Sequence, residues 1–362
     1  MLETPVLTMP RRLALAAGAA ALAVSPTGPP AFALSPMLDD RHEWESFKRR
    51  FIDPSGRVID TGNGGCSHTE GQGWGMLFAV ACDDPDTFES LYTWTARHLR
   101  RGYDALHSWR YQPNAPVPVA DRNNATDGDL SIATALWRAS RRWNRPDYAK
   151  VASAMGRDML VLLVTKAGSR TLLLPGIEGF TSRDSVTINP SYYAFPMLAE
   201  MAEAAPSPIW ARLVEDGQAM IEEGRFGQWR LPADWLQISR ITGAISPHPH
   251  WPARFSWDAI RVPLWLAWAR HSDTRAIEAF VSYWQAGRAA PPAWVDLNTN
   301  ATAPYPAPAG MQAIGCLALG CGHSEIGTPM PAGFPAIQAA SDYYSSALIL
   351  LSRLAWRESR VA

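Results

Sequence analysis

The chain has 362 residues, of which 47% are hydrophobic and 19% are charged, with 33 Lys and Arg against 34 Asp and Glu. This composition supplies a large core and excludes a mainly disordered chain. The net charge of −1 gives no electrostatic basis for binding nucleic acid, so no nucleic-acid partner is expected. The length exceeds that of most single cores, but an α/α barrel can use it as one domain.

The N-terminal 33 residues predict a signal peptide. Arg11-Arg12 forms a positive n-region, and the apolar stretch 13–24 is too short to span a bilayer. Prolines end this stretch, and Ala31-Phe32-Ala33 fits the small-x-small rule for cleavage before Leu34. We therefore expect a periplasmic or secreted protein, with residues 34–362 as one domain that has no membrane span. An uncleaved anchor is the alternative.

The chain has four cysteines and eight histidines, without the spacing of a metal site. In an oxidising compartment, Cys316 and Cys321 are close enough in sequence to pair across a turn. Cys66 and Cys82 flank a predicted helix about 20 Å long, so we expect that they do not pair with each other. The histidines are scattered along the chain. The sequence therefore predicts no metal and no cofactor.

Apolar residues recur at helical spacing along most of the chain after residue 36, and strand signals are few. Pro- and Gly-rich loops separate the helices, and the longest of these loops are expected to carry function. The predicted helices cover 38–50, 70–82, 85–99, 128–143, 147–164, 191–204, 208–222, 257–270, 274–286, 307–319 and 336–356. The longest loops cover 103–126, 168–190, 229–256 and 288–306.

Two kinds of helix are present in this pattern. Residues 257–268 and 346–355 are apolar nearly all round, which is typical of helices buried on both sides. Residues 85–99 and 208–222 have a charged face. An inner apolar layer within an outer amphipathic layer explains both kinds and predicts an all-α fold, an (α/α)6 barrel. A helical bundle or a solenoid is the alternative, but no internal repeat is visible.

Three acidic clusters stand at predicted junctions between a loop and a helix. Residues 67–75 contain Glu70, residues 123–129 contain Asp127 and Asp129, and residues 255–261 contain Asp258. Each cluster also has a structural interpretation. Ser67-x-x-Glu70 and Thr126-x-x-Asp129 fit capping boxes, and Asp258 with Arg261 fits a local ion pair.

Three details favour a site over simple caps. Gly71, Gly73 and Gly75 each cost a helix about 0.5–1 kcal/mol relative to Ala, which indicates close packing beside Glu70. Asp127 and Asp129 lie two residues apart, so they point in different directions. Acids among aromatic faces are what glycoside hydrolysis needs, and the aromatic residues near these clusters or in the long loops are Trp74, Trp109, Tyr111, Trp235, Trp251 and Trp257.

Together the clusters resemble glycoside hydrolase family 8, the bacterial endoglucanases and related enzymes. Residues 125–133 (ATDGDLSIA) look like the family signature. Residues 70–76 (EGQGWGM) are similar to the segment that carries its proton donor, and residues 257–263 (WDAIRVP) to the segment that carries its general base. Residues 189–192 and 342–344 match further segments, so the resemblance runs from about residue 40 to residue 356.

The resemblance implies an (α/α)6 barrel and an inverting mechanism. Glu70 would be the acid, Asp258 the base, and Asp127 would hold the distorted sugar, while Arg261 and Tyr192 would orient the base, its water or the sugar. The expected substrate is a β-1,4-glucan such as cellulose. The chain looks most like the endoglucanases that accompany bacterial cellulose synthesis, with the synthase machinery as a possible partner and a monomer as the expected state. Further substrate-binding residues are predicted at Trp109, Tyr111, Trp235 and Tyr343.

Other functions are compatible with parts of this pattern. A hydrolase of the same family could act on xylan, chitosan or mixed-linkage glucan. A polysaccharide lyase would need Arg, Lys or His to neutralise a uronate, whereas the candidate residues here are acidic and aromatic. A non-catalytic glycan-binding protein would keep the aromatic residues and could lose the acids, but Glu70 and Asp258 are both present.

Overall fold

The computed structural model describes residues 41–271, 274–286, 291–320, 330 and 333–359, which belong to one compact unit, Leu34–Ala362. The predicted signal peptide lies outside these residues and stays a prediction. The described α-helices are α1 (Arg41–Phe51), α2 (Thr69–Ala81), α3 (Pro85–Leu99), α4 (Thr126–Arg142), α5 (Pro146–Leu162), α6 (Phe195–Ala204), α7 (Pro208–Glu223), α8 (Arg261–Trp268), α9 (Arg275–Trp284), α10 (Ala309–Gly320) and α11 (Tyr343–Glu358).

Every helix predicted by periodicity overlaps one of these helices, but α6, α8 and α11 begin four or more residues later than predicted. Helix α6 begins at Phe195 because Pro196 occupies its first turn, and Pro190–Tyr192 forms a separate 3-10 helix. Helix α11 begins after Asp342, whose side chain accepts a hydrogen bond from Ser345 N–H. Helix α8 begins at Arg261, after a turn that holds Asp258.

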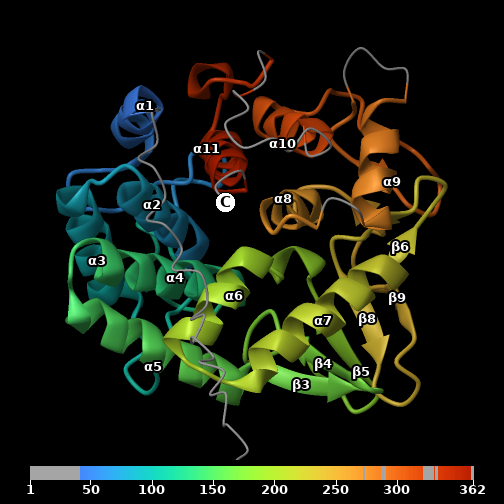
Figure 1. Cartoon of the computed structure of the whole chain (residues 1–362), viewed down its shortest axis with the longest axis horizontal. Helices are drawn as coiled ribbons and strands as arrows, with labels where there is room; N and C mark the ends of the chain where they lie inside the picture. The colour runs from blue at the N-terminus through green and yellow to red at the C-terminus, as the bar shows by residue number, and fades with distance from the viewer. Residues whose placement is uncertain (1–40, 272–273, 287–290, 321–329, 331–332, 360–362) are drawn as a thin grey trace, which may run out of the picture. The chain divides into compact units, whose positions relative to one another are not determined.

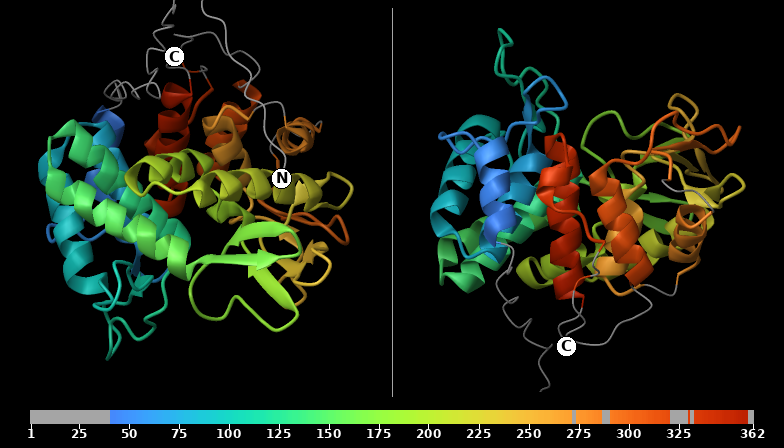
Figure 2. Two further views of the ribbon diagram at one scale, coloured as in Figure 1. Left: turned by 60° about the horizontal axis from the view of Figure 1, so that its bottom comes forward. Right: turned by 90° about the horizontal axis from the view of Figure 1, so that it is seen from above.

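The helices form two layers. Helices α2, α4, α6, α8 and α11 form an inner ring in which each contacts the next and α11 contacts α2 (Figure 1). All residues of α8 are buried, as are all residues of α2 except Glu70. Helices α1, α3, α5, α7 and α9 pack outside this ring, and α10 packs on α8, α9 and α11 (Figure 2). The prediction of an inner apolar layer and an outer amphipathic layer is confirmed.

The loops contain short strands, which the sequence pattern did not predict because two to four residues are too few to show alternation. Their bounds are β1 (Ser67–His68), β2 (Arg110–Tyr111), β3 (Val164–Ala167), β4 (Arg170–Leu173), β5 (Ser185–Ile188), β6 (Arg225–Phe226), β7 (Leu231–Pro232), β8 (Leu236–Ser239), β9 (Ile245–Pro247), β10 (Arg254–Phe255) and β11 (Val295–Asp296). All pairs are antiparallel, in four two-stranded sheets and one of order β5-β8-β9.

One strand pair positions the first acidic cluster. Ser67 of β1 pairs with Tyr111 of β2, and His68 pairs with Arg110. The backbone then continues directly into α2, and Thr69 N–H donates to the carbonyl of Trp109 at 2.9 Å. The pairing therefore fixes the start of α2, where Glu70 lies, against the loop between α3 and α4.

The described part of the chain contains Cys66, Cys82 and Cys316. Cys66 and Cys82 stand on either side of α2, and no disulfide joins these two residues, as expected. Cys321 is outside the described residues, so its pairing with Cys316 stays a prediction. None of the described helices has the length and apolar character that crossing a bilayer requires.

Candidate active site

Glycines allow α2 and α4 to approach each other unusually closely. A Cβ on Gly128 of α4 would lie 2.0 Å from Thr69 Oγ1 and 2.7 Å from the backbone nitrogen of Glu70. A Cβ on Gly73 of α2 would lie 2.6 Å from a side-chain carbon of α4. Only glycine fits at these two contacts, so the prediction of close packing beside Glu70 is confirmed. As a result, the first turns of both helices, with Glu70 and Asp127, face the same space.

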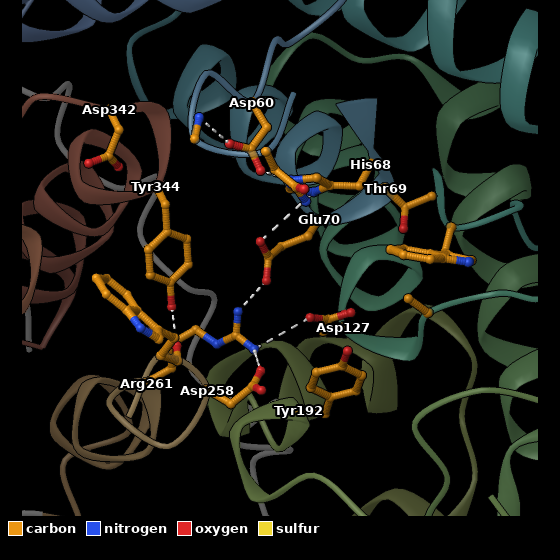
Figure 3. A pocket seen from close by; sticks show the side chains of 15 residues that line it. Asp60, His68, Thr69, Glu70, Asp127, Tyr192, Asp258, Arg261, Asp342 and Tyr344 are labelled. Atoms are coloured by element: carbon orange, nitrogen blue, oxygen red, sulfur yellow. Dashed lines mark hydrogen bonds and ion pairs between the residues drawn. The ribbon is translucent and has the colours of Figure 1, made fainter. Parts of the chain in front are cut away.

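A pocket of about 540 Å³ opens where these first turns meet the start of α8. It is lined by Glu70, Asp127 and Asp258, so the three acidic clusters of the sequence meet here (Figure 3). The side chains of Glu70 and Asp127 are 14% and 13% exposed, whereas that of Asp258 is 32% exposed. The pocket therefore combines two mostly buried carboxyl groups with one that is open to solvent.

Arg261 connects all three acids. Its Nη1 donates to Glu70 Oε2, and its Nη2 donates to Asp258 Oδ1 at 2.9 Å and lies 3.8 Å from Asp127 Oδ2. A further hydrogen bond of 2.8 Å from Arg261 Nη2 to Ser191 Oγ, in the 3-10 helix Pro190–Tyr192, holds the guanidinium. The predicted local pair between Asp258 and Arg261 is present, but the same side chain also reaches across the pocket to the first cluster.

Burial makes Glu70 and Asp127 bind protons more readily than exposed carboxyl groups do. Burial raises the pKa of Glu70, against the lowering effects of the Arg261 guanidinium and of a hydrogen bond with Asp127, and the charges of Asp258 and Asp60 add to the rise. Burial, followed by the charge of Glu70, raises the pKa of Asp127 well above its usual range. The two neighbouring carboxyl groups therefore keep a proton to higher pH than an exposed pair would.

The turn that holds Asp258 is fixed from behind by Asp234. The Asp234 carboxylate accepts hydrogen bonds from Ser256 N–H at 3.0 Å and from Ala259 N–H at 2.8 Å, and it also accepts one from the Ser256 hydroxyl. Burial and the nearby charge of Asp258 raise the pKa of Asp234 to about 6. The partly exposed Asp258 side chain thus stands on a backbone held by hydrogen bonds.

Aromatic side chains form walls of the pocket. Trp109 lines it, and its indole Nε1–H donates to Asp121 at 2.7 Å, which fixes the ring. Trp257, which is 43% exposed, and Tyr344 line the side near Asp258, and the Tyr344 hydroxyl donates to the Trp257 carbonyl. Tyr192 also lines the pocket. Exposed aromatic faces beside acids suit the apolar C–H faces of sugar rings.

Three of the predicted substrate-binding residues do not line this pocket. Tyr111 packs against Trp94 and His98 of α3, with ring centroids 5.2 and 5.6 Å away. Tyr343 is fully buried, and its neighbour Tyr344 lines the pocket instead, because successive residues of a helix point about 100° apart. Trp235 lies outside the lining but meets Tyr192 edge to face, with ring centroids 6.2 Å apart.

The two capping boxes suggested by the sequence are not formed. The N-cap of α2 is His68, and the Ser67 hydroxyl donates instead to the carbonyl of Val58. The N-cap of α4 is Ala125, which makes no side-chain cap. Asp129 is fully buried and accepts from His107 N–H at 3.0 Å, so it points away from the pocket that Asp127 lines. The prediction that Asp127 and Asp129 point in different directions is confirmed.

Sequence reasoning missed two polar residues of the pocket. Asp60 and His68 line it near Glu70; His68 belongs to the first acidic cluster but was given no role there, and Asp60 lies outside all three clusters. The visible signal was a histidine two residues before Glu70, next to Ser67, which was the expected helix cap. Within the described ranges, no group of three or more His, Cys, Asp or Glu side chains is arranged to hold a metal ion.

Comparison with known proteins gives consistent matches. The model of the family "Glycosyl hydrolases family 8" matches residues 19–358. The chain is 45% identical to the probable endoglucanase of Novacetimonas hansenii, over 88% of this chain and 91% of that one. It is 42% identical to the endoglucanase of Cellulomonas uda, over 76% and 77% of the two chains.

Solved structures agree with these matches. The endo-β-1,4-glucanase from Acetobacter xylinum superposes with a TM-score of 0.83 at 45% identity, covering 88% of this chain and 98% of that chain. The endoglucanase Cel10 from Klebsiella pneumoniae, described as a family 8 glycosyl hydrolase, gives 0.82 at 39% identity, with coverages of 88% and 100%. These likenesses confirm the predicted fold class.

Proposed function

This chain belongs to glycosyl hydrolases family 8, and we propose that it cuts internal β-1,4 bonds of a cellulose-like glucan with Glu70 as acid and Asp258 as base. It is a glycoside hydrolase of the endo-β-1,4-glucanase type, which agrees with its relatives and with a pocket of acids and aromatic rings. The assignment of the individual residues rests on the geometry described above.

Glu70 has the environment that a general acid needs. A glycosidic oxygen is a poor leaving group, so it requires a proton as the C1–O bond breaks. Glu70 is mostly buried, and its pKa is raised by that burial, so the carboxyl group can carry the proton to be donated. In the reaction the Glu70 O–H proton passes to the leaving oxygen, and Glu70 is left as a carboxylate beside Arg261.

Asp258 has the opposite environment, which suits a base. Its side chain is about one third exposed, so a water molecule can lie between this carboxylate and the sugar. The water oxygen bonds to C1 from the face opposite the leaving group, and Asp258 accepts the proton that the water loses. The anomeric configuration is inverted, and proton exchange with solvent restores Glu70 and Asp258 to their starting states.

The other pocket residues support these two steps. Asp127 lies beside Glu70 and Arg261, where its carboxyl group can hydrogen bond to the hydroxyls of the sugar at the cleavage point. Tyr192 lies against Arg261, with the guanidinium 5.9 Å from its ring centroid, and limits where the base-side water and the sugar can sit. Trp109, Trp257 and Tyr344 supply apolar faces for neighbouring sugars.

The observation that carries the proposal is the contrast between the mostly buried Glu70 and the partly exposed Asp258, held in one pocket by Arg261. The test compares viscosity loss and reducing-sugar release on soluble cellulose derivatives for the wild type, Glu70→Gln and Asp258→Asn. We expect both variants to lose activity by about 10²–10⁴-fold or more, the range that general acid–base catalysis contributes. Asp86→Asn is the matched control, since Asp86 is an exposed acid in the first turn of α3.

The outcomes separate the related functions. Retained activity in either active-site variant would contradict the residue assignment. Wild-type hydrolysis of xylan, chitosan or mixed-linkage glucan in place of cellulose would change the substrate and leave the chemistry intact. A lyase is disfavoured by the pocket, because its guanidinium, Arg261, is already bonded to two carboxyl groups and is not available to neutralise a uronate.

We also propose that the protein is exported and acts alongside cellulose synthesis as a monomer. The support for export is the sequence of the first 33 residues, and the support for the link to synthesis is the resemblance described above. Cell fractionation with N-terminal sequencing of the mature protein tests the first proposal and predicts Leu34 as the new N-terminus. Deleting the gene in a cellulose-producing host tests the second, with altered cellulose yield expected.

A further inference from the structure

The residue that caps α2 is a histidine whose proton position is fixed. His68 Nδ1 accepts a hydrogen bond of 3.0 Å from Gly71 N–H. A nitrogen that accepts cannot carry a proton, so the neutral ring carries its proton on Nε2. That nitrogen lies 3.2 Å from Asp60 Oδ2, where it donates. The helix start thus builds a chain of contacts from Gly71 through His68 to Asp60, directly beside Glu70.

The backbone holds Asp60 rigidly in this position. Asp60 N–H donates to the carbonyl of Cys66 at 2.9 Å, and Gly65 N–H donates to the carbonyl of Asp60 at 3.0 Å, which closes the turn between β1 and the preceding chain. The second carboxylate oxygen, Asp60 Oδ1, accepts from Gly62 N–H at 3.0 Å. Both oxygens of Asp60 are therefore engaged, and its charge is fixed in place at the pocket.

Helix α11 prevents the His68 ring from turning away. The Tyr343 ring meets it edge to face, with ring centroids 5.6 Å apart. Tyr343 is itself fully buried, and a Cβ on Gly71 would lie 2.8 Å from its hydroxyl, so this packing leaves no free space. Tyr343 N–H also donates to Thr61 Oγ1 at 3.1 Å, which ties α11 to the turn that carries Asp60.

Glu70 lies between this pair and Arg261 (Figure 3). His68 Nδ1 is 3.9 Å from Glu70 Oε1, while Arg261 bonds to Glu70 Oε2 on the other side. Building on the proposed function, we propose that Asp60 and His68 are positioning residues for the acid. They keep the Glu70 carboxyl group protonated and correctly oriented even though a guanidinium and a helix N-terminus lie beside it.

The electrostatic reason follows from what faces Glu70. The Arg261 guanidinium and the α2 N-terminus favour a carboxylate, which would leave no proton to donate. The negative charge of Asp60, which is hydrogen bonded to His68, opposes this, and Asp60 is among the groups that raise the pKa of Glu70. The remaining facing groups are the carboxyl groups of Asp127 and Asp258 and the hydroxyls of Tyr343 and Tyr344.

The test uses two variants that keep the local fold. His68→Asn retains a good N-cap side chain that can still accept from Gly71 N–H, but it loses the ring that reaches Asp60. Asp60→Asn keeps an oxygen for Gly62 N–H and removes the charge. Each variant is assayed on cellopentaose, whose leaving group needs a proton, and on 2,4-dinitrophenyl β-cellobioside, whose leaving group does not.

On cellopentaose we expect kcat to fall about 10–100-fold in both variants, with KM changed less than threefold, because the acid step alone is weakened. On 2,4-dinitrophenyl β-cellobioside we expect kcat to fall less than threefold in both variants. In Asp60→Asn the alkaline limb of kcat/KM on cellopentaose should move to lower pH. The sign follows because removing a negative charge lowers the pKa of Glu70, so the protonated acid is lost earlier as pH rises.

Measuring Glu70→Gln on the same two substrates tests the role of Glu70 as general acid separately from the positioning role of Asp60 and His68. Selective loss on cellopentaose in Glu70→Gln identifies Glu70 as the acid, while equal loss on both substrates would overturn the proposed function itself. If Glu70→Gln is selective but Asp60→Asn and His68→Asn lose activity equally on both substrates, or change only KM, the positioning role is wrong. Thermal melts identify any variant that has lost its fold, and Asp86→Asn serves as the unaffected control.

Discussion

The two sides of the pocket provide opposite environments for the same functional group. On the side of α2 and α4, Glu70 and Asp127 are packed between helices that glycines bring together, and about one seventh of each side chain is exposed. On the side of α8, Asp258 stands on a turn and is about one third exposed. The comparison shows that burial between packed helices raises the pKa of Glu70 and Asp127, whereas the turn leaves the Asp258 side chain more accessible to water.

The first prediction concerns Arg261, which contacts both sides. In Arg261→Lys a single ammonium group replaces a planar fork, so it can reach Glu70 or Asp258 but cannot bridge them. We expect kcat on cellopentaose to fall about 10²-fold, the cost of a misplacement of about 1 Å at a reacting group. Steady-state kinetics with a thermal melt check this. A kcat close to that of the wild type would show that the bridge is not needed.

The second prediction disrupts the packing of α2 against α4 and leaves the α8 side of the pocket unchanged. Gly128→Ala would place a methyl group against Thr69 and the backbone of Glu70, so we expect about 1–3 kcal/mol lower stability from overpacking, with reduced kcat. Denaturant unfolding measures the loss of stability, and steady-state kinetics on cellopentaose measure kcat. Gly333→Ala is the matched control, because a Cβ at Gly333 meets nothing within 4 Å. Equal behaviour of the two variants would refute the close crossing of α2 and α4.

The third prediction concerns the support of the exposed side, where Asp234 has a pKa of about 6 against an ordinary value of 3.8. Because the folded pKa is raised, the folded state binds more protons between these values. The contribution of Asp234 to stability is therefore complete below about pH 4 and is lost as pH rises through about 6. Asp234→Asn has no carboxyl group at this position, so it does not show this loss of stability with rising pH. We expect the difference in unfolding free energy between variant and wild type to change by roughly 2 kcal/mol from pH 4 to 6.

Denaturant unfolding at several pH values between about 4 and 7 makes this measurement. Curves for the two proteins that stay parallel with pH would mean that Asp234 does not titrate in this range. Asp234→Asn also compares the two sides of the pocket. It loosens the turn at Ser256 and Ala259, and we expect it to lower kcat less than Gly128→Ala, which disturbs the side of α2 and α4.

The fold was largely predictable from sequence, and the reasons lie in particular helices. Long helices such as α3 and α7 carry enough turns for apolar periodicity to place them within a residue or two. The starts of α6 and α11 were misplaced, although Pro196 and the cap at Asp342 carried the signal. The strands were missed because their pairing, as between β5 and β8, depends on residues about fifty positions apart.

The site was predictable where the acids lie in motifs and unpredictable where contacts are long-range. Glu70, Asp127 and Asp258 meet in one pocket, as the resemblance implied. Asp60 was missed because its approach to Glu70 depends on a turn, on β1 and on the His68 cap together. Tyr343 was chosen where Tyr344 lines the pocket, because a sequence motif does not fix which face of α11 turns inward.

The central claim is that Asp258 acts through a water molecule while the buried Glu70 donates the proton. The most direct measurement is ¹H NMR of the first product formed from cellopentaose, before the anomers of the new reducing end equilibrate. The account predicts the α-anomer first, because attack by water on the opposite face inverts C1. The β-anomer as first product would mean that a carboxylate attacks the sugar directly, and it would contradict the assignment of Asp258 as base.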